Sequence, residues 1–233
     1  MVSMDRPQAE PTPPRAVIAT GTGRYADPWH PFPATSARIA DALRADGWKV
    51  TVDEDVDHAL AQLDGFDLLV VNAGDPWRDG EAEIGHLSDP AADAGLRAAI
   101  GRGIGLVALH AALSSLRDHP AWREAIGGEW QPGLSWHPPV GDARVRVVDG
   151  EHPVSEGMPP LDVVDERYSD LVVDAGARVL AVHDVDGAEH AAVWVREQPT
   201  RAVVSSLGHD ERSYHSPAHV ALLQRAARWA ARA

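Results

Sequence analysis

The sequence predicts an α/β fold in which a mostly parallel sheet is extended by antiparallel strands. Three observations support this prediction. Over the first half of the chain, short apolar runs alternate with segments of helical periodicity, as in successive β-α-β units. After Gly127 the helical pattern gives way to short strands separated by turns. One amphipathic helix, with Ser216 as its N-cap and Pro217 at its first position, closes the chain.

The first half should supply the parallel part of the sheet. Four short segments, of which the second alternates between apolar and polar residues, are expected to be strands: 15–20, 48–52, 66–71 and 104–109. The third and fourth are continuous apolar runs, which are typical of strands buried on both faces. Helices are expected from about Ser36 to Gly47, over 90–102 before Gly103, and from His110. Because parallel strands need crossover connections, helices should cover both faces of the sheet.

The second half should extend the sheet with antiparallel strands. Five short alternating or apolar runs are expected there: 144–148, 161–164, 178–182, 191–195 and 201–205. The last of these is the candidate to rejoin the parallel core. Neither an internal repeat nor a linker appears, so we expect one domain over 15–233.

Residues 1–14 are polar and rich in proline, which predicts a disordered leader. This segment lacks the apolar core of a signal peptide, and no apolar run approaches the ~20 residues of a membrane span. We therefore expect a cytoplasmic protein that has no membrane partner.

The charge and the absence of cysteine exclude some functions. A net charge of −14 without a basic run argues against a nucleic-acid partner, because phosphate binding needs a concentrated basic surface. No cysteine is present, so disulfides, thiolate metal sites and a cysteine nucleophile are all excluded.

The segment Gly21-Thr-Gly-Arg-Tyr-Ala26 matches a dinucleotide-binding pattern after a strand. That function requires a helix to begin at once, so that its amides hold the pyrophosphate. Prolines at 28, 31 and 33 follow instead. A pocket loop that carries Tyr25, Trp29 and His30 is the better interpretation.

The junction at His110 is the most informative segment, since an apolar strand meets a helical pattern there. A side chain at such a turn lies at the carboxyl edge of the sheet, where open α/β sheets bind ligands. A histidine in this position can transfer a proton or bind a metal. The alternative is a histidine that only bonds to nearby backbone.

Seven segments together resemble the ThuA-like (trehalose-utilisation) family of the class I glutamine amidotransferase superfamily. They occur in order between residues 15 and 232: Gly105–Ala112, Trp122, Ile126–Trp130, His137-Pro138, His152-Pro153 with Gly157, Asp165–Tyr168, and Leu207–Asp210. The resemblance implies a flavodoxin-like three-layer sandwich. In that superfamily the strand-to-helix elbow normally holds a cysteine nucleophile, but this sequence has His110 there. No glutaminase chemistry is therefore expected.

The resemblance also implies a role in carbohydrate metabolism, with a sugar or keto-sugar as the small-molecule partner. We expect general acid–base chemistry in which His110 and Glu166 transfer the proton, assisted by His209 and Asp210. The substrate would be held by four further residues: His30, Trp136, His137 and Tyr168. Glu166 and Tyr168 are two residues apart, which places them on one face of an extended segment. This hypothesis requires no cofactor and leaves open a homo-oligomer.

Two other functions stay open. The chain could be a non-catalytic sugar-binding or scaffold module, because a fold alone does not establish catalysis. It could also be a metal-dependent hydrolase, with a divalent metal such as zinc bound by His110, His137 and His209. At single residues the simpler interpretations are that Asp210 caps a helix and that Glu166 and Tyr168 lie on a solvated face.

Overall fold

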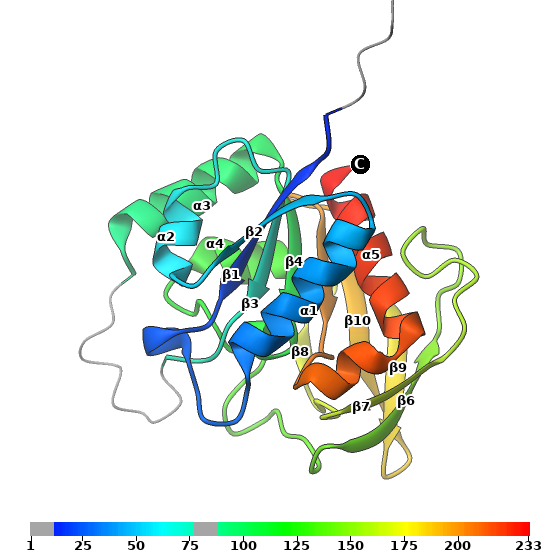
Figure 1. The fold of residues 1–233 in the computed structure, drawn as a ribbon. Coiled ribbons are helices and arrows are strands. Elements are labelled where there is room, and N and C mark those ends of the chain that lie inside the picture. The colour runs from blue at the N-terminus through cyan, green and yellow to red at the C-terminus, as the bar shows by residue number, and fades with distance from the viewer. Residues whose placement is uncertain (1–11, 77–87) are drawn as a thin grey trace, which may run out of the picture.

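The computed structural model describes residues 12–76 and 88–233. Most of the predicted leader and Trp77 lie outside the described residues. A nine-stranded sheet runs through the molecule in the order β2-β1-β3-β4-β11-β10-β9-β6-β7 (Figure 1). The predicted α/β fold, mostly parallel in its first half and antiparallel in its extension, is confirmed.

The parallel half contains five strands. They are β2 (Lys49–Asp53), β1 (Arg15–Thr20), β3 (Leu68–Asn72), β4 (Gly105–Leu109) and β11 (Ala202–Ser205). Every neighbouring pair among them is parallel. The last predicted strand therefore does rejoin the core, because β11 pairs with β4.

The antiparallel half continues from β11. It consists of β10 (Ala188–Arg196), β9 (Arg178–Val185), β6 (Gly141–Val147) and β7 (Leu161–Asp165). Four antiparallel steps lead from β11 to β7, so β7 runs in the same direction as β4. The carboxyl end of β7 consequently lies at the same edge of the sheet as the carboxyl ends of β1, β4 and β11.

Helices cover both faces of the sheet (Figure 1). On one face lie α1 (Phe32–Ala45) and α5 (Pro217–Ala231). On the other lie α2 (Val56–Ala61), α3 (Pro90–Arg102) and α4 (Pro120–Ile126). Within β1 the side chains alternate between the two cores, with Ile18 in one and Val17 in the other. Burial on both faces explains why the central strands are continuous apolar runs.

The first helix differs from its prediction. It begins at Phe32 rather than near Ser36, with Pro33 in its first turn. Proline is tolerated there because the first backbone N–H groups of a helix have no intrahelical partner. The helix still begins six residues after Ala26, and a Cβ on Gly21 would lie 2.6 Å from the Tyr25 carbonyl oxygen. Close packing of the loop thus accounts for this glycine without a dinucleotide.

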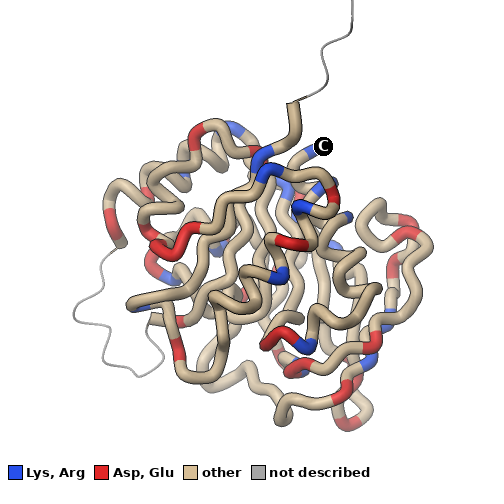
Figure 2. Tube along the Cα trace, in the orientation of Figure 1, with Lys and Arg blue, Asp and Glu red and all other residues tan. Residues whose placement is uncertain are grey.

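Three 3₁₀ helices and one small sheet complete the described chain. The helices are η1 (Gly23–Tyr25), η3 (His110–Leu113) and η4 (Glu211–His215), and the small sheet pairs β5 (Gly128–Glu129) with β8 (Val172–Val173). Acidic and basic positions are interspersed along the described trace (Figure 2). No helix among the described residues has the length and apolar character needed to cross a membrane.

Candidate functional site

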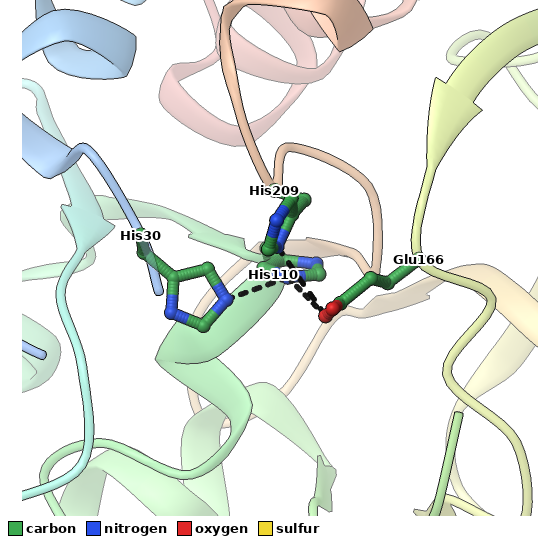
Figure 3. Close-up of side chains that lie close together, drawn as sticks. All are labelled: His30, His110, Glu166 and His209. Atoms are coloured by element: carbon green, nitrogen blue, oxygen red, sulfur yellow. Dashed lines mark hydrogen bonds and ion pairs between the residues drawn. The ribbon is translucent and has the colours of Figure 1, made fainter. Parts of the chain in front are cut away.

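Four polar side chains meet at the carboxyl edge of the sheet (Figure 3). His30 comes from the loop between β1 and α1, and His110 follows β4 directly. Glu166 follows β7, and His209 lies in the loop after β11. These residues are up to 179 positions apart (209 − 30), and the shared direction of their strands brings them together.

His110 begins η3 at the end of β4, with a left-handed φ of 47°. Its side chain is only 1% exposed. The ring stacks on Tyr168 with 4.2 Å between centroids, and its Nδ1–H donates to the carbonyl oxygen of Ser206 at 2.7 Å. This bond fixes the ring so that Nε2 points toward the other three side chains.

Glu166 is the common neighbour of three imidazoles. Its Oε2 lies 3.4 Å from His110 Nε2 and 3.3 Å from His209 Nδ1. Its Oε1 lies 3.5 Å from Nδ1 of His137. The carboxylate therefore has imidazole nitrogen atoms on several sides, and no Lys or Arg appears among these ion pairs.

His30 approaches from the opposite side of the cluster. Its Nδ1–H donates to the Asp27 carboxylate, with 2.7 Å to Oδ2 and 2.9 Å to Oδ1. The other ring nitrogen, Nε2, lies 3.1 Å from Nε2 of His110. Sequence reasoning missed Asp27, although it stands only three residues before His30 in the loop already singled out.

Burial and mutual charge shift the pKa values of the cluster. Burial acts to raise the pKa of Glu166, but the contacts with His110 and His209 outweigh it and lower that pKa far below its usual value. Burial acts to lower the pKa of His209, but Glu166 raises it above its ordinary value. For His30, burial lowers the pKa more than Asp27 raises it. Burial, followed by the nearby carboxylates, raises the pKa of Tyr168 well above 10.

Asp165 organises two of the loops that carry the cluster, and sequence reasoning missed it. It is buried, and its carboxylate accepts from the backbone N–H of Gly208 at 2.8 Å and of His209 at 3.2 Å. The hydroxyl of Ser213 also donates to it, at 2.5 Å. The available signal was its position, since it ends strand β7 and opens the Asp165–Tyr168 segment.

Two predicted site residues lie elsewhere. Asp210 caps η4, accepting from the backbone N–H of Arg212, and its carboxylate pairs with the Arg212 side chain. The structure thus shows the capping role that the simpler interpretation of Asp210 expected. Trp136 is 40% exposed and donates from Nε1 to Asp170 at 2.7 Å, so its ring is held on the surface.

A cavity of about 290 Å³ opens beside the cluster. Its wall includes Glu166, His30, His137 and Tyr168, together with Trp130 and the exposed Trp29. Trp130 packs edge-on against Tyr168, with 4.6 Å between the ring centroids. Trp130, and not Trp136, is therefore among the residues that line the cavity. His110 and His209 are not among the residues that line the cavity, but both contact residues that do, Glu166 among them.

The set of residues able to bind a metal also differs from the predicted set. The four side chains His30, His110, Glu166 and His209 each offer one ligand atom, and these atoms all lie within 4.8 Å of one another. His137, the third predicted ligand, does not belong to this group. Its ring faces Glu166 Oε1 and its own neighbour, the Pro138 carbonyl oxygen, at 3.0 Å.

Comparisons with known proteins agree with this architecture. A sequence model of the ThuA family, described as trehalose utilisation, matches residues 15–230. No functionally curated protein matches the sequence. The fold is similar to ThuA-like proteins from Parabacteroides merdae (18% identity, TM-score 0.77, covering 94% of this chain and 90% of that one) and Bacteroides uniformis (18%, 0.74, 97% and 95%). A glutamine amidotransferase from Thermotoga maritima is also similar in fold (12%, 0.52, 83% and 75%).

Proposed function

The chain belongs to the ThuA (trehalose-utilisation) family, and from this premise we propose that it acts on a sugar or keto-sugar by proton transfer at Glu166. The substrate binds in the cavity at the carboxyl edge of the sheet. Glu166 faces that cavity and exchanges the proton, and His110 and His209 support it from behind.

One observation carries the proposal: a carboxylate backed by imidazoles forms the wall of a cavity that also has aromatic side chains. Its volume of about 290 Å³ lies just below the usual range for ligand sites, which suits a small polar molecule. Trp130 and Tyr168 offer ring faces and edges for the apolar side of a sugar. His30, His137 and the Tyr168 hydroxyl offer polar contacts for its hydroxyl groups.

The chemistry fits an oxidised sugar well. A carbonyl group acidifies the hydrogen on the neighbouring carbon, so a carboxylate close to that carbon can remove it as a proton. The electron pair moves onto the carbonyl oxygen, and the proton returns to the same or an adjacent atom. Polar groups on the cavity wall would stabilise the negative charge that develops on oxygen.

The test combines binding and turnover over a panel of sugars and keto-sugars. We expect at least one compound to raise the melting temperature and to be converted, and Glu166→Gln to lose turnover by ~10²–10⁴-fold while still binding. Glu189→Gln is the matched control, because Glu189 is exposed on β10 and pairs with Arg146. Binding without turnover in the wild-type protein would instead favour a sugar-binding module.

A further inference from the structure

We propose that His30, His110, Glu166 and His209 together bind one divalent transition-metal ion. This inference goes beyond the proposed function, because it rests on the geometry of the four side chains and not on the identity of the substrate. The side chains can bind the ion through Nε2 of His30, Nε2 of His110, a carboxylate oxygen of Glu166 and Nδ1 of His209.

The first argument comes from the tautomers of His30 and His110. In His30 the Nδ1–H is used by the Asp27 carboxylate, and in His110 the Nδ1–H is used by the Ser206 carbonyl oxygen. A neutral imidazole carries one N–H, so both Nε2 atoms then present lone pairs. These two atoms lie only 3.1 Å apart. Two lone pairs at this distance repel, and either a proton or a cation between them removes the repulsion.

The other two side chains favour the cation. A single proton between His30 and His110 would still leave Nδ1 of His209 without a partner. Nδ1 of His209 is buried and has no well-aligned hydrogen bond among the described residues, although Glu166 Oε2 is 3.3 Å away. Buried polar atoms normally have a partner, so this nitrogen needs an explanation. One ion accounts for all four atoms at once.

The distances suit a metal site. Nitrogen and oxygen ligands bind zinc at about 2.0–2.2 Å in a tetrahedral arrangement, which separates neighbouring ligand atoms by roughly 3.3–3.6 Å. Three measured separations are 3.1, 3.3 and 3.4 Å. No separation among the four ligand atoms exceeds 4.8 Å. Small side-chain rotations are therefore enough to complete the coordination.

The surroundings also resemble those of bound metals. Metal-binding histidines usually donate their second N–H to a carboxylate or a backbone carbonyl, as His30 and His110 do here. Glu166 and Asp27 supply two negative charges close to the ion. His30 and Glu166 lie on the cavity wall, so the ion can enter from the cavity and face a ligand bound there. Three imidazoles and a carboxylate, without thiolates, suit zinc and other first-row metals.

With the ion bound, Glu166 and His110 serve as ligands. A fifth coordination position that faces the cavity can then hold either a sugar oxygen, which the ion polarises, or a hydroxide, which accepts the proton. The proton transfer of the proposed function would then depend on the bound ion. The same arrangement would also allow hydrolysis.

The direct test measures the metal itself. Protein purified without a histidine tag or chelator should contain about one transition-metal ion per chain by elemental analysis. After chelation, titration calorimetry with Zn²⁺ should show one tight site, and Co²⁺ should give the visible absorption of a low-coordinate nitrogen and oxygen site. His209→Asn should weaken Zn²⁺ binding strongly. Asp27→Asn should weaken it by ~10–100-fold although Asp27 is not a ligand.

His58→Asn is the control, because His58 is an exposed histidine that pairs with Asp53 and does not belong to the cluster. It should leave Zn²⁺ binding unchanged, and circular dichroism should show that each variant is folded. The inference is overturned if the wild-type protein binds Zn²⁺ no more tightly than the His209→Asn variant does. Sugar turnover without metal binding would overturn it and leave the proposed function standing. Stoichiometric metal without turnover of any sugar would support the metal site and contradict the proposed function.

Discussion

The buried carboxylate of Asp165 accepts a hydrogen bond from the backbone N–H of His209, 44 residues further along the chain, at 3.2 Å. The same carboxylate also accepts from the backbone N–H of Glu166, at 2.9 Å, which follows it directly at the end of β7. This one side chain therefore sets the separation between Glu166 and His209. It does so without entering the cavity.

Asp165→Asn should consequently destabilise the protein and damage the site. Both carboxylate oxygens of Asp165 accept hydrogen bonds, whereas an asparagine side chain has only one acceptor oxygen. Its NH₂ group would face some of the same donors, and those buried donors would be left unpaired. We expect the free energy of unfolding to fall by about 2–4 kcal/mol, as measured by urea denaturation, together with weaker Zn²⁺ binding. Asp162→Asn is the control and should cost under about 1 kcal/mol, since Asp162 lies on the same strand as Asp165 but forms an exposed pair with Arg144 of β6. Equal losses in the two variants would contradict this role.

The sequence predicted the fold well because strands that are buried on both faces appear in a sequence as continuous apolar runs. Continuous apolar runs marked β3 and β4, and glycine or proline marked the ends of most helices. The expected boundary of α1 was wrong because proline disfavours a helix only in its interior, and Pro33 occupies the first turn.

The site was only partly predictable, for a physical reason. His110, Glu166 and His209 lie at strand ends, and strand direction decides which edge of the sheet they share. Asp27 and Asp165 act through hydrogen bonds to other site residues, and a single sequence does not show which partner a buried carboxylate will find. Trp136 and Trp130 both lie in loops, so only tertiary structure could show which of them reaches the cavity.

Substitution of His110 should affect stability more than expected for an accessible polar residue. The ring is buried, stacked on Tyr168 and bonded to Ser206, and its backbone has a φ of 47°. His110→Ala should lower the free energy of unfolding by about 2–4 kcal/mol. His110→Asn should cost roughly 1 kcal/mol less, because asparagine tolerates the left-handed conformation. Urea denaturation of both variants checks the order, and an Ala variant as stable as the Asn variant would contradict it.

The two tryptophans near the cavity should differ in their effect on binding. Trp130 contacts Tyr168 and lies on the cavity wall, whereas Trp136 is held on the surface by Asp170. For the sugar that gives the largest thermal shift, Trp130→Leu should weaken binding by up to about 10-fold, since aromatic contacts are worth about 0.5–1.5 kcal/mol. Trp136→Leu should change it by less than about 3-fold. Calorimetric titration of both variants measures the difference, and the reverse order would place the sugar elsewhere.

The protein should release no ammonia from glutamine under any condition. Hydrolysis of glutamine on the amidotransferase scaffold needs a thiolate nucleophile, and the chain contains no cysteine. A coupled ammonia assay on highly purified protein checks this, with heat-inactivated protein as the control. Ammonia release above that control would require a nucleophile that the described site does not offer.

Acid should destabilise the protein through His219. This side chain is fully buried in α5, stacked on Tyr214, and close to Ser213 at 2.9 Å. Burial lowers its pKa, and the opposing influence of Asp165 is smaller. The folded state therefore keeps the ring neutral where the unfolded chain, with a pKa of about 6.5, takes up a proton. Stability from this residue is complete above that pH and is lost as the pH falls, by up to about 1.4 kcal/mol per pH unit.

Urea unfolding at several pH values between 7.5 and 5.5 measures this loss. His219→Gln removes the titrating group, so its stability should fall less steeply with acid, and the gap between variant and wild type should narrow as the pH drops. His58→Gln is the control, because the pKa of His58 is shifted in the opposite direction to that of His219. Asp53 raises the pKa of the exposed His58, so this residue adds stability at low pH, and its removal should not reduce the acid loss. Parallel stability curves for wild type and His219→Gln would show that His219 is not the group responsible.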